Sequence, residues 1–314
     1  MSFVNHKRIA LSTELKTEHF DFPRAKMLRA AFERCVEEHF LAQQIGGLEV
    51  RGLMVTGQSR VGKSRELKSL VKEFNESGTL MADGRPAKVV SCLLSGRVTF
   101  KDLGIKTLKS LGYDLQRRSP TQEYIWERVV DQAERQGVIG IHFDECQHVF
   151  IDGAKSNKIF LDSFKSMMKE PRWPMMLILS GVPTLSNYIR SYEQLEKLVD
   201  PVHFDEIRLK RDRDQLVKLL YCYADSVKMN IDELVTPDFL ARLDHACSHR
   251  WGLVIELLIN TLVEVKLSGR NHLEVNDFAV QFATKTGTLM RSSPFTAPDF
   301  LQAFDSQKLF EMNS

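Results

Sequence analysis

The chain has few cysteines, and none of them forms a recognisable pair. Its 314 residues include five cysteines, an odd number, with no C-x-x-C spacing. This pattern excludes a disulfide framework and the usual zinc-binding spacings. It is typical of proteins kept in a reducing compartment, so we expect a cytoplasmic protein.

Long apolar runs are also missing. A membrane-spanning helix needs roughly 18 apolar residues, whereas the apolar run at residues 173–182 is short and contains Pro174. Residues 1–16 mix charges without an apolar centre, which predicts no signal peptide. We therefore expect no membrane partner.

Neither sign of charge dominates. The 43 Lys+Arg against 41 Asp+Glu leave a net charge of +2, which excludes a uniformly basic nucleic-acid coat but allows local basic faces. A hydrophobic fraction of 43% beside 27% charged residues is typical of a folded protein with a core. Disordered, collagen-like and coiled-coil classes are therefore excluded.

Short apolar runs are present, and they alternate with segments of helical period. They lie at residues 53–56, 89–94, 138–143 and 176–180. This alternation predicts an α/β fold with a parallel sheet and crossover helices. Only helical patterns follow residue 210. We predict four regions, namely an N-terminal arm (1–22), a core (23–209), a small all-helical lid domain (210–284) and an extended C-terminal tail that binds a partner (285–314).

One segment matches the phosphate-binding pattern G-x-x-x-x-G-K-[ST] in full. It reads Gly57-Gln58-Ser59-Arg60-Val61-Gly62-Lys63-Ser64. It follows a predicted strand and precedes a predicted helix, a context that a chance glycine turn would not share. The backbone N–H groups and the helix N-terminus, beginning with Arg65, are expected to cradle phosphates. Lys63 would reach the β and γ phosphates of ATP, and the Ser64 hydroxyl would bind Mg²⁺.

Two adjacent carboxylates, Asp144 and Glu145, follow the strand predicted at residues 138–143. Side chains alternate along a strand, so we expect Asp144 to face Mg²⁺ and Glu145 to activate the attacking water as general base. A kinase also uses a phosphate loop, but an adjacent Asp-Glu pair is typical of a hydrolase. The alternative is a strand that merely ends in acidic turn residues. Ser180, at the end of the next strand, is either a sensor of the γ-phosphate or a turn residue.

With these motifs the chain resembles the AAA+ ATPases of the TniB/TnsC type, the MuB-like regulators of DNA transposition. The resemblance covers about residues 23–267. It rests on the phosphate loop, the run from Asp144 to His148, residues 100–120 and residues 189–196. It implies an AAA+ P-loop core with a helical lid.

The resemblance also implies partners and a function. It implies head-to-tail rings or filaments of the chain on duplex DNA, with ATP and Mg²⁺ as ligands. The assembly would link a target-selector protein to a transposase subunit, which the C-terminal tail would contact. ATP hydrolysis would then drive disassembly.

Two positions depart from the family pattern. Leu198 stands where the family commonly has an arginine that reaches a neighbour's γ-phosphate, which leaves Arg190 as the candidate for that role, or as a surface charge. The lid lacks the usual arginine three residues after Gly252, so Arg250 is either a substitute that binds the nucleotide or a solvated residue at a helix start. We therefore expect slow intrinsic hydrolysis.

Basic side chains near two loops predict sequence-independent, salt-sensitive contacts with DNA phosphates. In the family, loops at corresponding positions line the inner surface of the ring. The alternative is ordinary solvated helix faces. The residues predicted to bind DNA are Thr99, Lys101, Lys155, Lys158 and Lys165.

Other function classes share these core motifs. One is an AAA+ switch of another system, such as a helicase loader, an origin-recognition-like ATPase or a defence signalling switch. Another is an ATP-dependent scaffold with little hydrolysis, which Leu198 leaves open and the intact Glu145 opposes.

Overall fold

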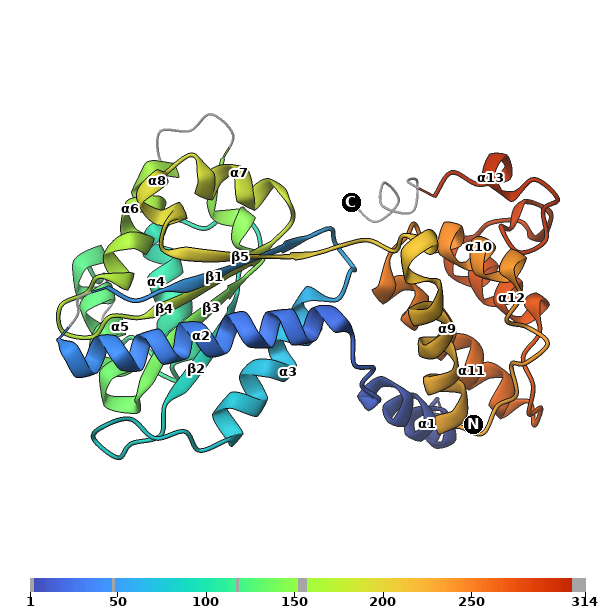
Figure 1. Ribbon diagram of the computed structural model, residues 1–314, viewed down its shortest axis with the longest axis horizontal. Helices are drawn as coiled ribbons and strands as arrows, with labels where there is room; N and C mark the ends of the chain where they lie inside the picture. Colours follow the sequence, from blue (N-terminus) through green and yellow to red (C-terminus); the bar gives the residue numbers. More distant parts are fainter. Residues whose placement is uncertain (1–2, 47–48, 117–118, 152–156, 307–314) are drawn as a thin grey trace. The chain divides into compact units, whose positions relative to one another are not determined.

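A computed structural model describes residues 3–46, 49–116, 119–151 and 157–306. The chain divides into two compact units (Figure 1). The sheet unit spans Phe22–Asp205, and the helical unit combines the residues up to Asp21 with those from Glu206 onward.

The sheet unit contains a five-stranded sheet in the order β2-β3-β4-β1-β5, and every neighbouring pair of strands is parallel. This arrangement confirms the predicted fold class. The strands are β1 (Gly52–Gly57), β2 (Lys88–Leu93), β3 (Val138–Asp144), β4 (Met176–Gly181) and β5 (Val199–Phe204). Because all five strands run the same way, their carboxyl ends meet at one edge, where such sheets bind ligands.

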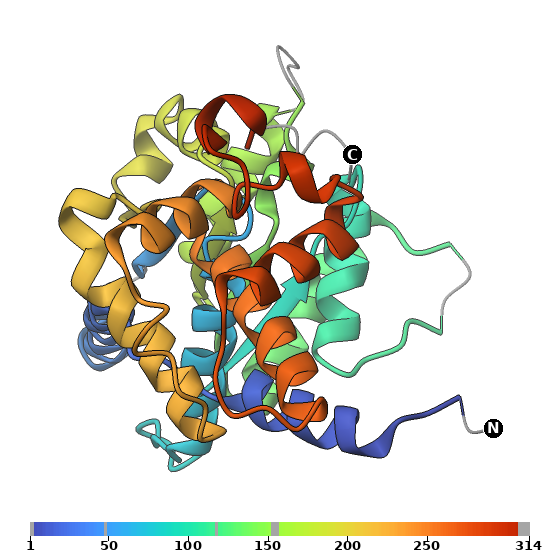
Figure 2. The same ribbon diagram turned by 90° about the vertical axis from the view of Figure 1, so that its right-hand side faces the viewer.

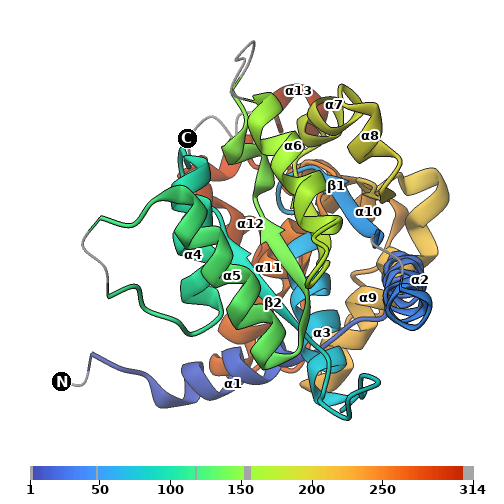
Figure 3. The same cartoon turned by 90° about the vertical axis from the view of Figure 1, so that its left-hand side faces the viewer.

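Helices cover both faces of this sheet, with α2 and α3 on one face and α4 to α8 on the other (Figure 3). These helices are α2 (Pro23–Ile45), α3 (Lys63–Glu76), α4 (Phe100–Ser110), α5 (Gln122–Gln136), α6 (Asn157–Met168), α7 (Thr184–Arg190) and α8 (Glu193–Glu196), with the 3-10 helix η1 (Cys146–Val149) after β3. Right-handed crossovers require this change of face, since the path along the sheet reverses after β2.

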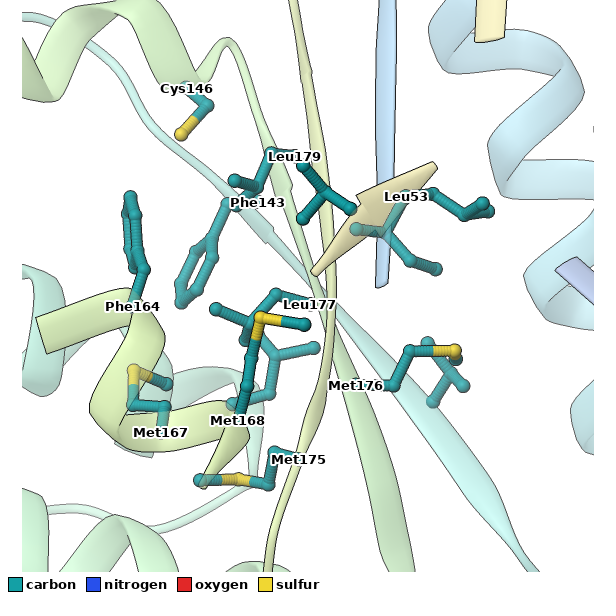
Figure 4. Close-up of a cluster of buried hydrophobic side chains, with 14 of the residues drawn as sticks. Leu53, Phe143, Cys146, Phe164, Met167, Met168, Met175, Met176, Leu177 and Leu179 are labelled. Carbon is teal, nitrogen blue, oxygen red and sulfur yellow. The ribbon is translucent and has the colours of Figure 1, made fainter. Parts of the chain in front are cut away.

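The core lies between these layers. Strands β1 and β4 are buried at every residue, as expected for strands covered on both faces. On one face, Phe164 and Met168 of α6 pack beside Phe143 of β3 (Figure 4), and the rings of Phe143 and Phe164 lie 5.7 Å apart. The buried residues of α6 are Phe160, Leu161, Phe164, Met167 and Met168, which recur at helical spacing.

Strand β5 was not predicted from the sequence. It contains Pro201, which cannot donate a backbone hydrogen bond and therefore reads against a strand. The structure accommodates Pro201 because β5 lies at the edge of the sheet and pairs with β1 alone.

In the helical unit, α11 contacts α1, α9 and α12 (Figure 2). The elements of this unit are α1 (His6–Thr17), α9 (Leu209–Ser226), α10 (Pro237–Ala246), α11 (Trp251–Leu267), α12 (Val275–Thr286), the 3-10 helix η2 (Met290–Ser292) and α13 (Phe300–Ala303). None of the helices within the described ranges is both long and apolar enough to cross a membrane.

The N-terminal segment differs from the polar arm that we expected. Residues 6–17 form α1, which contacts α11 and is joined to it by an ion pair between Arg8 and Glu264. Its Leu15 is fully buried. The segment was misread because only one of its helical residues is buried, too few to produce an apolar periodicity.

The C-terminal segment also differs from the extended tail that we expected. Phe295 is 4% exposed and packs among Phe239, Phe278 and Phe282 of the same unit. Arg242 of α10 donates hydrogen bonds of 2.8 Å to the carbonyls of Pro294 and Ala297. Phe295, Phe300 and Phe304 therefore contact residues of their own unit, whereas Leu289 and Leu301 remain exposed. Residues 307–314 lie outside the described ranges.

Candidate functional site

The phosphate loop connects β1 to α3 at the carboxyl edge of the sheet. Its lysine, Lys63, is 5% exposed, and its ammonium group donates to the carbonyls of Gly57 at 2.7 Å and Gln58 at 2.9 Å. Val61 is fully buried and anchors the loop, whereas Ser64 is exposed at the start of α3. The loop therefore concentrates a lysine charge and a helix N-terminus at one place.

The backbone of this loop has the shape of an anion cradle. Arg60 has φ 65° and Gly62 has φ 107°, so the chain turns its N–H groups through left-handed conformations. A Cβ atom at Gly62 would lie 3.1 Å from the guanidinium of Arg24. Glycine at this position thus permits both the backbone turn and the close approach of a second positive group.

Arg24, at the start of α2, is a residue of this site that the sequence analysis missed. Its guanidinium carbon lies 4.1 Å from the ring centroid of Phe22 and 5.1 Å from that of Phe204, consistent with cation–π contacts. No local pattern marks Arg24, because only the fold brings the start of α2 to the phosphate loop.

Asp144 ends β3 at the same edge of the sheet and accepts two hydrogen bonds on Oδ1. The Ser180 hydroxyl donates at 2.6 Å, and the backbone N–H of Glu145 donates at 3.0 Å. Ser180 is fully buried, and its oxygen also lies 2.8 Å from Nε2 of His142. The residue predicted as a phosphate sensor thus contacts the carboxylate that we expect to bind Mg²⁺.

Glu145 lies beyond the strand rather than within it. Its φ of 56° is left-handed, so the strand alternation that we used to orient the two carboxylates does not apply to it. Gln147 holds the Glu145 carboxylate through a hydrogen bond of 2.5 Å. The other end of the Gln147 amide accepts from the backbone N–H of Val182 at 3.2 Å, which links Glu145 to the end of β4.

Burial determines the protonation of two groups beside these carboxylates. It lowers the pKa of His142 to about 4, so the imidazole is neutral at physiological pH. It raises the pKa of the fully buried Cys146, which keeps this thiol protonated and unreactive.

These residues suit a nucleotide carrying Mg²⁺. Within the described ranges, no group of three or more His, Cys, Asp or Glu side chains could hold a metal ion. Mg²⁺ is usually held by one or two protein oxygens together with phosphate oxygens and water. Asp144 and the exposed Ser64 hydroxyl supply oxygens of this kind.

Two predicted site residues lie apart from this cluster. Arg190 is exposed at the end of α7 and forms no ion pair with any described residue. Arg250 belongs to the helical unit, where its guanidinium contacts Glu206 at 3.0 Å and the carbonyl of Ser248 at 3.1 Å. Their roles toward the nucleotide therefore remain predictions.

The predicted DNA contacts lie in different environments. Lys101 and Lys158 are exposed, and Lys155 lies outside the described residues. Thr99 is occupied as the N-cap of α4, in a capping box with Asp102.

Lys165 differs from the exposed lysines. Its ammonium group donates to Gln194 at 2.8 Å and to the Tyr192 hydroxyl at 3.1 Å, so it joins α6 to α8 rather than projecting into solvent. A surface cleft of about 600 Å³ lies beside α6. Its lining includes the acidic residues Glu123, Glu127, Asp162 and Glu170. The surface around α6 is therefore of mixed charge.

Comparison with known proteins identifies the fold. Residues 50–189 match the family described as AAA domain. No curated protein sequence matches the chain significantly.

Three solved structures illustrate the likeness of this chain to known proteins. The Aeropyrum pernix ORC1 protein, in complex with DNA, has a TM-score of 0.60 at 12% identity, over 90% of this chain and 71% of that one. Cdc6p from Pyrobaculum aerophilum has a TM-score of 0.60 at 12% identity, over 86% and 70% of the two chains. The Aeropyrum pernix ORC2 protein, in ADPNP-ADP complexes, has a TM-score of 0.57 at 15% identity, over 89% of this chain and 74% of that one. The chain thus has an AAA+ P-loop fold with a helical C-terminal region.

Proposed function

We propose that the chain is an ATP-hydrolysing AAA+ switch that acts on duplex DNA. The observation that carries this proposal is the convergence of Lys63, Asp144 and Glu145 at one edge of a parallel sheet. Each of the three side chains makes a hydrogen bond that holds it in place. The Lys63 ammonium group donates to the Gly57 carbonyl, the Asp144 carboxylate accepts from the Glu145 N–H, and the Glu145 carboxylate accepts from the Gln147 amide. A triphosphate fits this edge because the loop offers backbone N–H groups, a lysine and a helix N-terminus.

In this proposal the chain's own groups bind and orient the substrate. Lys63 and the loop N–H groups bind the β and γ phosphates, and Asp144 and Ser64 provide oxygens for Mg²⁺. Bound Mg²⁺ would neutralise charge on the phosphates. Glu145 accepts a proton from the water that attacks the γ-phosphorus, while the bond to ADP breaks.

Assembly on DNA extends the proposal beyond a single chain. Of the predicted DNA contacts that the structure describes, Lys101 and Lys158 are exposed lysines that can reach a phosphate, whereas Lys165 donates hydrogen bonds within the unit. Two lysines in one chain bind weakly, but a multimer adds the contacts of its members. Arg190, exposed and without an ion-pair partner among the described residues, is the candidate to reach a neighbour's nucleotide.

We favour regulation of DNA transposition as the biological role, on the strength of the motifs shared with TniB/TnsC-type proteins. The C-terminal segment would then meet a transposase subunit through residues left exposed, such as Leu301 at 64% exposure. An origin-recognition-like role is the second candidate, and the fold shared with the ORC1 and Cdc6p structures supports it.

The test combines nucleotide turnover with imaging on DNA. We expect slow release of phosphate from ATP, and ATP-dependent rings or filaments on duplexes of unrelated sequence. A Glu145→Gln variant, which keeps the fold, is the matched control and should form complexes that persist. A wild-type protein that neither releases phosphate nor assembles would overturn the proposal. Assembly on one preferred sequence alone would favour the origin-recognition-like role.

A further inference from the structure

A continuous chain of hydrogen bonds crosses three neighbouring strands and ends on Asp144. Ser91 of β2 lies 3.1 Å from Nδ1 of His142 in β3, and Nε2 of His142 lies 2.8 Å from the hydroxyl of Ser180 in β4. Ser180 in turn donates to Oδ1 of Asp144 at 2.6 Å. The strand register places Ser91 directly beside His142.

The directions of these hydrogen bonds follow from the chemistry of the groups. An ionised carboxylate only accepts, so Ser180 gives its single hydrogen to Asp144. The Ser180 oxygen must then accept from Nε2–H of the neutral His142 ring. Nδ1 of that ring is left as an acceptor for the hydroxyl of Ser91. One tautomer therefore satisfies the whole chain.

The two carboxylate oxygens of Asp144 differ in the hydrogen bonds that they accept. Oδ1 receives the Ser180 hydroxyl and the Glu145 N–H. Oδ2 makes no hydrogen bond with any described side chain or backbone group. Outer hydrogen bonds of this kind fix the orientation of a carboxylate and tune its affinity for a cation.

We propose that His142 is a positioning residue that holds Asp144, through Ser180, in the orientation that presents Oδ2 to a divalent cation. This inference rests on the proposed function, because it assumes that the cation accompanies a nucleotide at this edge. Ser180 acts in it through Asp144 rather than by touching the γ-phosphate, since its hydroxyl is fully buried.

A second buried histidine provides a matched control. His39 of α2 is fully buried, and burial lowers its pKa to about 4, as for His142. Neither ring nitrogen of His39 has a hydrogen-bond partner among the described residues. Replacing His39 therefore removes a buried histidine from the sheet unit without disturbing the chain that ends on Asp144.

The first measurement is the affinity of the protein for Mn²⁺ in the presence of a non-hydrolysable ATP analogue. Binding is monitored through the electron paramagnetic resonance signal of Mn²⁺. The variants are His142→Leu, His142→Gln, Ser180→Ala and the control His39→Leu. Loss of an outer hydrogen bond typically weakens metal affinity by about 10–100-fold. We expect a loss in this range for His142→Leu and Ser180→Ala, and none for His39→Leu.

The Gln and Leu variants separate positioning from packing. The amide of Gln can donate to Ser180 in place of Nε2–H, so we expect His142→Gln to recover most of the Mn²⁺ affinity. Metal-free ADP should bind all the variants as tightly as the wild type, because Asp144 acts through the cation. Wild-type Mn²⁺ affinity in His142→Leu, or loss of metal-free ADP binding, would overturn the proposal.

The second measurement does not need nucleotide at all. The ¹⁵N NMR spectrum of the histidine rings distinguishes the two neutral tautomers, and we expect His142 to carry its proton on Nε2. A proton on Nδ1 would overturn the inference even if the protein binds ATP. Conversely, a wild type that binds no nucleotide but shows the Nε2–H tautomer would refute the proposed function while leaving the hydrogen-bond chain intact.

Discussion

Two regions of the sheet unit were assigned a binding role from the sequence, and they differ in how the structure holds their side chains. At the carboxyl edge of the sheet, Lys63, Asp144 and Glu145 all have defined hydrogen-bond partners. Around α4 and α6, Lys101 and Lys158 are exposed, whereas Lys165 contacts Tyr192 and Gln194.

The difference reflects what each of the two proposed activities requires. Hydrolysis needs groups held within fractions of an ångström, so the structure fixes them with buried contacts. Sequence-independent binding to DNA needs only charge that can reach a phosphate, so its residues can remain flexible and solvated. A substitution at the sheet edge should therefore have a large, specific effect, and one on the lysines a small, graded effect.

The largest effect is expected from Glu145→Gln. A general base typically contributes about 10²–10⁴-fold to a rate, so phosphate release should fall by at least about 100-fold. Nucleotide binding should stay near the wild-type value, since Gln keeps the shape of the side chain and can still meet Gln147. Single-turnover phosphate release with a parallel binding titration checks both. Unchanged turnover would remove the contrast between the two regions.

A smaller effect, on stability, is expected from His39→Leu. This variant tests how much a buried histidine without hydrogen-bond partners among the described residues destabilises the sheet unit. A buried polar group without partners costs about 1–3 kcal/mol, so the variant should raise the free energy of unfolding by a similar amount. His142→Leu should lower it, because it leaves the Ser180 oxygen without a donor. Urea unfolding of the two variants gives both values. Equal changes would show that the partners of His142 are irrelevant to stability.

His39 also contributes to the pH dependence of unfolding. The pKa of His39 is about 4 in the folded protein against 6.5 as its ordinary value, so the unfolded chain binds the proton more tightly. His39 therefore contributes a stability that is present above pH 6.5 and is lost as pH falls toward 4, by about 1.4 kcal/mol per pH unit. Removing His39 should lessen this slope, and an unchanged slope between pH 6.5 and 4 would contradict the prediction.

The smallest effect is expected on the lysine side of the comparison. Each phosphate contact contributes about 0.9 to the slope of log affinity against log salt. Lys101→Ala with Lys158→Ala should therefore lower the slope by up to about 1.8, whereas Lys165→Ala should leave it unchanged. Anisotropy titrations on one duplex at several salt concentrations measure this. A larger change for Lys165 would reverse our assignment of these residues.

The sequence was sufficient where function depends on local spacing. The phosphate loop, the pair Asp144 and Glu145, and the strands carrying them are contiguous patterns, and the structure places them at one edge of the sheet.

The sequence was insufficient where partners come from distant segments. Arg24 reaches the loop only through the packing of α2, and the chain from Ser91 to Asp144 needs the strand order of the sheet. Lys158 and Lys165 look alike in the sequence, since both are lysines of α6. They differ in the structure because Lys165 donates hydrogen bonds to Tyr192 and Gln194. Pro201 likewise argues against a strand at residues 199–204 in the sequence. The structure accommodates it because β5 lies at the edge of the sheet.

Calorimetric titration of the wild type and Lys63→Ala with ATP analogue and Mg²⁺ tests the central claim most directly. A hydrogen bond from a charged group contributes about 1.5–3 kcal/mol, so we predict saturable binding to the wild type, weakened by about 10–150-fold in Lys63→Ala. No heat of binding to the wild type, or equal affinity in the two proteins, would contradict the assignment of the sheet edge as a nucleotide site.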